Sequence, residues 1–320
     1  MSAVDLRAAL SEVFGRPVSD VSRTVSIRSS SCAIEDLIVR FGNGETREVV
    51  FKNLGPDGKL EAARAIRPSF VYTQIREIEV YRALLSRFNL GAPRLYGAKT
   101  DSELDRYWLF LEKISAPALF EIAAFERWLD AAAWLGLLHG ACDAEEARRA
   151  APSLATHDAE YYWRWLRRAR KYAGPALDRI ASGYHHVVDA LLRIPHAWIH
   201  GEFYPSNILV GALDNPRICA VDWELSAVAP ALLDVAALAS GSWTRAQRLQ
   251  MLNAYLEKSP PHLRRQDAVH AFDCCQLHIA IQWLGWSENW RPHRRHAHDW
   301  LSEAIALAAL PSLAGFFKRP

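Results

Sequence analysis

Two different periods of hydrophobic and polar residues divide the first part of the chain. Apolar positions recur at helical spacing over residues 2–14, and Gly15 follows where such a helix would end. The pattern then changes to short runs, rich in β-branched residues, over 21–28, 33–41 and 47–54. This order predicts one N-terminal helix followed by three strands.

A turn signal joins the second and third of these runs. The Gly-Asn-Gly sequence at 42–44 is typical of a tight hairpin between antiparallel strands. A helical pattern then covers 68–88, and two more strand-like runs cover 94–98 and 107–114. We therefore expect residues 1–114 to form an N-terminal lobe, a small antiparallel sheet with one inserted helix.

The rest of the chain, residues 115–320, has mainly the period of helices. The predicted helices cover 121–141, 158–172, 176–193, 232–240, 243–257, 262–286 and 298–310. One strand-rich segment, residues 197–222, interrupts them. The pattern predicts an α+β protein with two lobes, the second mainly helical, and a ligand cleft between them.

Composition narrows the class of protein. The chain has 320 residues, half of them hydrophobic, and a formal net charge of +2. Disorder needs low hydrophobicity and high net charge, so we expect a folded chain. A nearly neutral total also argues against a nucleic-acid binder, because such proteins gain most of their affinity from many phosphate contacts.

The cysteines and the N-terminus bear on location. The five cysteines are an odd number without paired CxxC spacing, which argues against disulfide or structural zinc frameworks. The first residues lack an apolar signal core, and no run of 18 apolar residues occurs. We expect a reduced, cytoplasmic protein with no membrane partner.

The strand-rich segment contains the candidate chemistry. Residues 208–210 and 218–221 are apolar and β-prone, with turn-forming residues between them. A hairpin there brings Asn207 near Asp222, and their oxygen atoms are ligands suited to Mg²⁺. A carboxylate at Glu202 could take the proton of an attacking hydroxyl. The alternative is that these are ordinary turn residues at the ends of a surface hairpin.

Lys52 has unusual surroundings for a lysine. It lies in an apolar strand and shares one face with Val50 and Leu54, so its ammonium group must enter a cleft or meet a counter-ion. Glu77 on the inserted helix is the expected partner, and Glu79 is the rival on a different helical face. The alternative is a lysine at the surface edge of the sheet.

These residues occur in a familiar order. His200-Gly-Glu-x-x-x-x-Asn207 followed by Val221-Asp222-Trp-Glu224 resembles the motifs of the aminoglycoside phosphotransferase and choline kinase family, which has a protein-kinase-like fold. Other landmarks of that family follow in order between residues 21 and 240. They are Val49–Lys52, Arg76-Glu77-x-x-x-Tyr81, Trp108–Ile114, Leu137-Leu138-His139 and Ala229-Pro230-x-x-x-Asp234.

The resemblance implies a role for each candidate residue. Lys52, held by Glu77, would bind the phosphates of ATP or another nucleoside triphosphate, with Asn207 and Asp222 on Mg²⁺. His200 would brace the loop, and Glu202 would act as the base. The other cofactor-binding candidates are the serine loop and the hinge between the lobes: Ser29, Ser30, Ser31, Glu112, Lys113 and Ile114.

One residue departs from the motif of the family, and this difference leaves other functions open. The family normally has Asp where this chain has Glu202, and the extra methylene moves the carboxylate by roughly 1.5 Å against a contact of about 3 Å. The expected activity is phosphotransfer to the hydroxyl of a small molecule. The alternatives are a pseudokinase, that is, a nucleotide-binding regulatory module, and a transferase of AMP.

The C-terminal third is the expected place of the acceptor. Trp283, Trp286, Trp290 and Trp300 gather there, and Tyr161 lies on an earlier helix. Aromatic walls bind sugars, flat rings or quaternary ammonium groups, although residues at helical spacing also form ordinary packing. The segment has few acids, which disfavours a polycationic aminoglycoside. We expect an aromatic or sugar-like acceptor; the sequence leaves the oligomeric state open.

Overall fold

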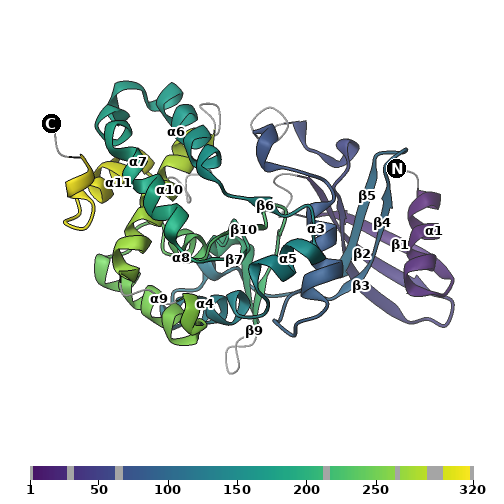
Figure 1. The fold of residues 1–320 in the computed structure, drawn as a ribbon. Coiled ribbons are helices and arrows are strands. Elements are labelled where there is room, and N and C mark those ends of the chain that lie inside the picture. Colours follow the sequence, from purple (N-terminus) through teal and green to yellow (C-terminus); the bar gives the residue numbers. More distant parts are fainter. Residues whose placement is uncertain are drawn as a thin grey trace.

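The computed structural model describes residues 3–26, 32–61, 68–211, 217–263, 267–286 and 298–317. A sheet occupies one end of the molecule and a group of helices the other (Figure 1). The predicted α+β architecture with a sheet lobe and a helical lobe is therefore confirmed.

The sheet lobe contains five antiparallel strands in the order β1-β2-β3-β5-β4. The strands are β1 (Val18–Val25), β2 (Ala33–Phe41), β3 (Thr46–Asn53), β4 (Leu95–Asp101) and β5 (Arg106–Glu112). The predicted hairpin joins β2 to β3, with Arg40 opposite Thr46. Helix α1 (Ala3–Phe14) covers the face of the sheet that points away from the helical lobe (Figure 1).

Alternation along β3 decides which side chains reach the other lobe. Val49 and Phe51 pack under α1. Val50 and Leu54 contact the main core on the opposite face, and Lys52 shares that face by the two-residue period of a strand. The predicted common face of Val50, Lys52 and Leu54 is thus confirmed.

The inserted helix starts later than the sequence pattern indicates. It begins at α3 (Arg76–Glu79) and continues as a π-helical turn, η3 (Val80–Leu85); a separate 3₁₀ turn covers Ser69–Val71. The prediction of one helix from residue 68 was wrong because Tyr72 is extended, with φ −119° and ψ 139°. Its hydroxyl donates to the carbonyl of Leu54 at 2.8 Å, which fixes this extended segment against the sheet.

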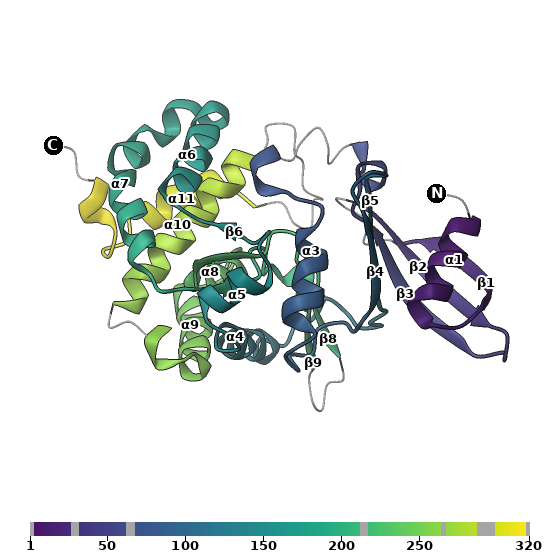
Figure 2. The same ribbon diagram turned by 45° about the vertical axis from the view of Figure 1, so that its right-hand side comes forward.

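The second lobe is mainly helical. Its helices are α4 (Glu126–His139), α5 (Ala144–Ala150), α6 (Ala159–Ala173), α7 (Asp178–Arg193), α8 (Leu232–Leu238), α9 (Arg245–Lys258), α10 (Ala268–Trp286) and α11 (Trp300–Ala308). Helix α10 is the centre of the lobe and packs against α6, α7, α8 and α11. Figure 2 shows α3 between the sheet and these helices. The short helix α5, capped by Asp143, was not predicted.

Two small sheets lie among the helices. Strands β8 (Ile208–Gly211) and β9 (Arg217–Ala220) form the predicted hairpin, with Ile208 opposite Ala220. Its predicted turn at 213–215 lies outside the described residues. The other sheet has the order β6-β10-β7, from β6 (Ala155–Thr156), β10 (Ala227–Pro230) and β7 (His196–Ile199). Strands β6 and β10 were not predicted from the sequence.

All five cysteines are buried free thiols. Within the part of the chain that the structure describes, no helix combines the length and the apolar character needed to cross a membrane.

Candidate active site

The loop between β7 and β8 is held by one buried carboxylate. Asp234 on α8 accepts hydrogen bonds from the backbone N–H groups of His200, at 2.7 Å, and Gly201, at 2.9 Å. Gly201 has a φ of +88°, and a Cβ atom there would lie 2.2 Å from the carbonyl oxygen of Leu225. Only glycine fits this close turn. The two residues that precede Glu202 in the loop are therefore held in one conformation.

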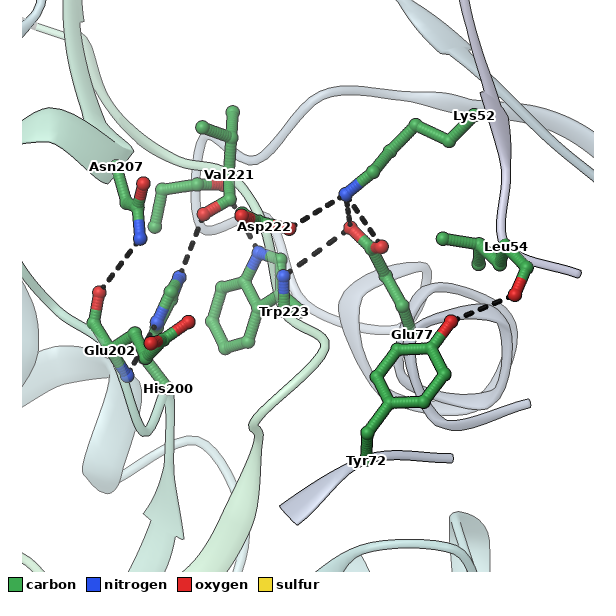
Figure 3. A network of polar contacts seen from close by, with 11 residues as sticks. Lys52, Leu54, Tyr72, Glu77, His200, Glu202, Asn207, Val221, Asp222 and Trp223 are labelled. Atoms are coloured by element: carbon green, nitrogen blue, oxygen red, sulfur yellow. Dashed lines mark hydrogen bonds and ion pairs between the residues drawn. The ribbon is translucent and has the colours of Figure 1, made fainter. Parts of the chain in front are cut away.

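His200 links this loop to the end of the hairpin (Figure 3). Its Nε2–H donates to the carbonyl of Val221 at 3.0 Å, and its Nδ1 accepts from the backbone N–H of Glu202 at 3.2 Å. Both bonds require the neutral imidazole with the proton on Nε2. Burial lowers the pKa of His200, and this effect outweighs the Asp234 carboxylate, which acts to raise it. The lowered pKa also favours the neutral imidazole. His200 can thus brace the loop without exchanging a proton.

Asn207 lies at the start of β8, close to Glu202. Its Nδ2 donates to the carbonyl of Glu202 at 3.1 Å, as Figure 3 shows. Its carbonyl accepts from the N–H of Val221 at 2.9 Å, next to Asp222. The hairpin therefore brings Asn207 and Asp222 to one end of two paired strands, as the sequence predicts. With the amide nitrogen engaged, the amide oxygen is the atom that can bind a cation.

Three carboxylates meet beside Asn207. One oxygen atom from each of Glu202, Asp222 and Glu224 lies within 4.8 Å of the other two. An all-oxygen donor set of this kind suits Mg²⁺. Asp222 adopts the left-handed φ of 67°, a strained conformation for a residue with a side chain. The donor chemistry fits the metal that the sequence predicts.

Glu224 is the residue that the sequence analysis did not assign. It is 1% exposed and shares the cluster, although it was quoted only as part of the Asp222 motif. The available signal was the Asp-Trp-Glu spacing, since a turn can direct two acids, separated by one residue, to one point.

Lys52 joins the two lobes through an ion-pair network (Figure 3). Its Nζ lies 2.6 and 2.8 Å from the two carboxylate oxygens of Glu77 and 2.8 Å from Oδ1 of Asp222. Lys52 is 4% exposed and Glu77 is 1% exposed. Burial disfavours the ammonium ion, but Asp222 and Glu77 together raise the pKa of Lys52 well above its usual value. The lysine is a charged group inside the cleft, and the surface-edge alternative is excluded.

Glu79 has a different partner. Its Oε2 accepts hydrogen bonds from the backbone N–H of Ser153 at 2.9 Å and from its hydroxyl at 2.5 Å. The choice of Glu77 over Glu79 as the residue that meets Lys52 is therefore correct. Glu79 fastens helix α3 to the helical lobe instead.

The hinge candidates have separate surroundings. The Glu112 carboxylate lies 3.0 Å from the Arg217 guanidinium, which helps to lower the pKa of Glu112 against the effect of its burial. Lys113 lies 3.3 Å from Asp36 and 3.6 Å from Glu48. Both charged side chains are used in ion pairs, Glu112 across the lobes with Arg217 and Lys113 within the sheet lobe. This leaves backbone groups as the atoms that could recognise a base.

Ile114 provides apolar surface at the hinge. It packs on a small cluster made of Ala118, Leu209, Cys219, Ala116 and Val221. A flat apolar surface next to the hairpin end is suited to one face of a nucleobase. Ser29, Ser30 and Ser31, the predicted phosphate loop, lie outside the described residues.

The predicted aromatic cluster forms around α10. Trp283 stacks on Trp300, with ring centroids 5.3 Å apart, and Trp286 stacks on Trp165 at 5.7 Å. Tyr204, from the loop after Glu202, lies 5.1 Å from Trp283. Trp290 lies outside the described residues.

Two tyrosines connect this cluster to Glu202. Burial, together with the nearby Glu202 carboxylate, raises the pKa of both Tyr161 and Tyr204. Tyr204 was not singled out from the sequence, where it is only an aromatic residue inside the loop. Both tyrosines are therefore neutral phenols within electrostatic reach of Glu202.

The chain resembles known phosphotransferases in sequence and fold. The profile of the phosphotransferase enzyme family matches residues 35–268. No curated protein sequence matches the chain significantly.

Solved structures with the same fold cover nearly the whole chain. A microcompartment-associated aminopropanol kinase has a TM-score of 0.66 and 14% identity, with 99% of both chains covered. An ethanolamine kinase of Plasmodium vivax has a TM-score of 0.60 and 14% identity, covering 92% of this chain and 83% of its own.

A spectinomycin phosphotransferase, solved with ADP and spectinomycin, has a TM-score of 0.57 and 13% identity, covering 99% and 97%. At sequence identities this low, the similarity establishes the fold alone. The shared fold confirms the predicted protein-kinase-like arrangement. The family match spans well over half of the sequence and includes Lys52, Glu77, Glu202 and Asp222. The chain therefore belongs to the phosphotransferase enzyme family.

Proposed function

We propose that the protein transfers the γ-phosphate of ATP, with Mg²⁺, to a hydroxyl group of a small molecule. The observation that carries this proposal is the position of Lys52. Its ammonium lies 2.8 Å from Asp222, and Asp222 belongs to a three-carboxylate cluster that includes Glu202. Phosphoryl transfer needs such a cation and such metal ligands on the phosphates, next to a group that can orient the nucleophile.

On the nucleotide side, Lys52 binds the α- and β-phosphates and Glu77 holds it in place. Asn207 and Asp222 bind Mg²⁺, with the Glu224 carboxylate close enough to contribute. When bound, the metal would neutralise charge that develops on the phosphates. Backbone groups of the hinge, beside Ile114, hold the base.

Two further parts of the proposal come from the resemblance in sequence. Ser29, Ser30 and Ser31 would contact the phosphates of the nucleotide. The lobes divide at residues 114 and 115, so that 1–114 binds the nucleotide and 115–320 holds the acceptor.

On the acceptor side, Glu202 orients the attacking hydroxyl and takes its proton. The hydroxyl oxygen forms a bond to the γ-phosphorus, and the bond from that phosphorus to the bridging oxygen breaks, which leaves ADP. His200 keeps the loop in place as a neutral brace and takes no part in the proton transfer. The location that we propose for the enzyme is the cytoplasm, from its cysteine pattern.

The acceptor is a small molecule with an aromatic or sugar-like body. The aromatic groups of this region support this choice, since Tyr161 and Tyr204 are aromatic side chains within electrostatic reach of Glu202.

A pair of substitutions at position 202 tests the proposal. We expect Glu202→Gln to lower kcat by about 10²-fold or more, the usual scale of general-base catalysis, because an amide cannot accept the proton. Glu202→Asp keeps the carboxylate and should retain part of the rate. The affinity for ATP should change little in either variant, because Lys52 and the metal ligands hold the phosphates.

The products distinguish this proposal from its alternatives. ADP and a phosphorylated acceptor, identified by mass spectrometry, support phosphotransfer. Pyrophosphate release would instead indicate transfer of AMP. Mg·ATP binding without turnover over a broad panel of hydroxylated compounds would indicate a nucleotide-binding regulatory module. Turnover of a true acceptor at the wild-type rate by Glu202→Gln would exclude Glu202 as the base.

A further inference from the structure

Arg76 is a buried charged residue that the proposed mechanism does not use. It lies one position before Glu77, at the start of α3, and belongs to the Arg-Glu motif of the sequence. Arg76 is 5% exposed. A buried guanidinium needs partners for its N–H groups, because an ionised group that leaves water without them is very costly. Its hydrogen-bond partners therefore indicate what the residue does.

Three backbone carbonyl groups accept hydrogen bonds from Arg76. Its Nε donates to Ser153 at 2.8 Å, and its Nη1 donates to Val71 at 2.8 Å and to Glu224 at 2.9 Å. These carbonyls belong to the segment before α3, the segment before β6 and the turn of the carboxylate cluster. A guanidinium is planar and directs its donors rigidly, so Arg76 fixes these three segments relative to one another.

The turn from Asp222 to Glu224 needs support from its surroundings. Asp222 has a φ of 67°, and such a strained conformation persists only where other contacts hold it. Before the turn, the carbonyl of Val221 accepts a hydrogen bond from His200 at 3.0 Å. At the end of the turn, the carbonyl of Glu224 accepts from Arg76. The loop that contains Glu202 therefore holds one end of the turn, and α3 holds the other.

Helix α3 also contacts the middle of this turn. Oε1 of Glu77 accepts from the backbone N–H of Trp223 at 3.3 Å, as Figure 3 shows. Glu77 serves two groups, because it also binds Lys52, so its loss would disturb the phosphate ligand and the turn together. Arg76 and Lys52 both carry only donors and do not bind each other. A change at Arg76 therefore acts on the turn without removing the partner of the lysine.

We propose that Arg76 is a positioning residue for the metal ion. By holding the carbonyl of Glu224, it keeps the turn in the conformation that directs the carboxylates of Asp222 and Glu224 to one point beside Glu202. Arg76 acts through the turn and contacts neither the metal nor the substrate. This inference rests on the proposed phosphotransfer. Residues that orient metal ligands typically change metal affinity by roughly 10- to 100-fold when they are substituted.

Two substitutions on α3 separate positioning of the turn from fastening of the helix. Arg76→Lys keeps the charge but lacks the planar fork, so it cannot hold three carbonyls in the same geometry. Glu79→Gln weakens the bonds to Ser153 and leaves the turn unchanged. The measurement is binding of Mn²⁺, in place of Mg²⁺, to the ADP-bound protein by electron paramagnetic resonance. We expect the Kd of Mn²⁺ to rise by about 10-fold in Arg76→Lys and to stay within about twofold in Glu79→Gln.

Two further measurements show whether the effect is specific to the metal. In EDTA, the affinity of Arg76→Lys for ADP should stay within about twofold of the wild type, because Lys52 keeps its partner Glu77. The Mg²⁺ concentration for half-maximal turnover should rise by the same factor as the Kd of Mn²⁺, and saturating Mg²⁺ should restore most of the rate. A merely structural role would instead lower thermal stability and the number of Mn²⁺ sites per protein, without changing the affinity of each site, and would overturn the inference.

Other outcomes keep this inference apart from the proposed function. Wild-type affinity for Mn²⁺ in folded Arg76→Lys would overturn the inference and leave phosphotransfer intact. Equal losses in Arg76→Lys and Glu79→Gln would also overturn it, because Arg76 would then only fasten α3. If Arg76→Lys does not fold, Arg76→Gln replaces it, and failure of both to fold would show that Arg76 maintains the whole fold and would overturn the inference as well. Absence of Mn²⁺ binding in the ADP-bound wild type would remove the proposed function itself.

Discussion

Lys52, Glu77 and Asp222 meet one another at 2.6–2.8 Å, whereas the helical lobe buries several neutral polar atoms that have no partner among the described residues. These neutral atoms include His157 Nδ1, Tyr162 Oη and His278 Nε2. The first group consists of charged side chains that are paired by ion pairs. The second consists of neutral, mostly aromatic side chains, some of whose polar atoms have no partner among the described residues.

The difference follows from the cost of burial. An isolated buried charge is far more costly than an unpaired neutral group, so the ionic network must be complete in the folded chain. Neutral phenol and imidazole groups can stay without a protein partner at a lower free-energy cost, and they can then bind water or a ligand. The network that we assign to the nucleotide is therefore already formed, while the helical lobe retains buried polar atoms without a partner among the described residues.

The largest effect is expected from a substitution that removes the charge of a proposed metal ligand in the ionic network. Asp222→Asn keeps the volume of the side chain but removes its charge. We expect Mg·ATP-dependent turnover to fall by about 10³-fold or more, on the order of 4 kcal/mol of transition-state stabilisation. The measurement is ADP formation over a Mg²⁺ titration, with circular dichroism to verify the fold. Unchanged turnover in a folded variant would contradict the assignment of Asp222 as a metal ligand.

The next effect concerns Lys52 itself. Lys52→Met keeps much of the stem and removes the ammonium, so turnover should fall by about 10²-fold, on the order of 3 kcal/mol. The loss should appear in steady-state turnover with ATP as the varied substrate. Thermal unfolding must be measured in parallel, because Glu77 and Asp222 would then face each other without a cation between them.

A matched pair of substitutions on α3 sharpens this result. Glu77→Gln should lower turnover by roughly 10-fold, since it misplaces Lys52 without deleting it. Glu79→Gln should leave turnover within about twofold and reduce only stability, because Glu79 binds Ser153 and not the lysine. If Glu79→Gln lowered turnover and Glu77→Gln did not, the partner of Lys52 during catalysis would be Glu79. Helix α3 would then have to turn from the orientation that the structure shows.

The contrast between the two regions also explains what the sequence could predict. The hairpin, the loop from His200 to Asn207 and the strand of Lys52 are short segments whose neighbours along the chain already define their geometry. Their order predicted the partner Glu77 correctly across 25 residues. Two arguments selected Glu77: a buried ammonium needs a counter-ion, and the segment that contains Glu77 resembles the lysine-pairing helix of the phosphotransferase family.

The cavity of about 260 Å³ where the two lobes meet could not be predicted in this way. Phe70, His157, Tyr161 and Leu225 come from separate segments, and each one alone is a common core residue. The late start of α3 had the same cause, since the hydrogen bond from Tyr72 to Leu54 is a contact between distant segments that outweighs local helix propensity. Strand β10 was missed because it is a buried apolar run beside a helix of similar composition.

The last effect is expected on the neutral side, where it concerns stability and not turnover: the protein should lose stability in acid. His278 is fully buried, and burial lowers its pKa to about 3, whereas an unfolded histidine titrates near 6.5. Between these values the unfolded chain binds the proton and the folded chain does not, so stability falls as the pH decreases below about 6.5. At pH 5.0 the contribution of His278 is a loss of about 2 kcal/mol relative to pH 7.5.

Urea unfolding of the wild type and of His278→Asn at both pH values measures this contribution. Asn offers Tyr184 a hydrogen-bonding atom in place of Nδ1, which now lies 2.8 Å from the tyrosine hydroxyl, but it does not titrate. The variant should therefore lose about 2 kcal/mol less than the wild type on acidification, even if it is less stable at pH 7.5. Equal losses in both proteins would mean that His278 is protonated in the folded state, and that the helical lobe contains a buried charge like the cleft.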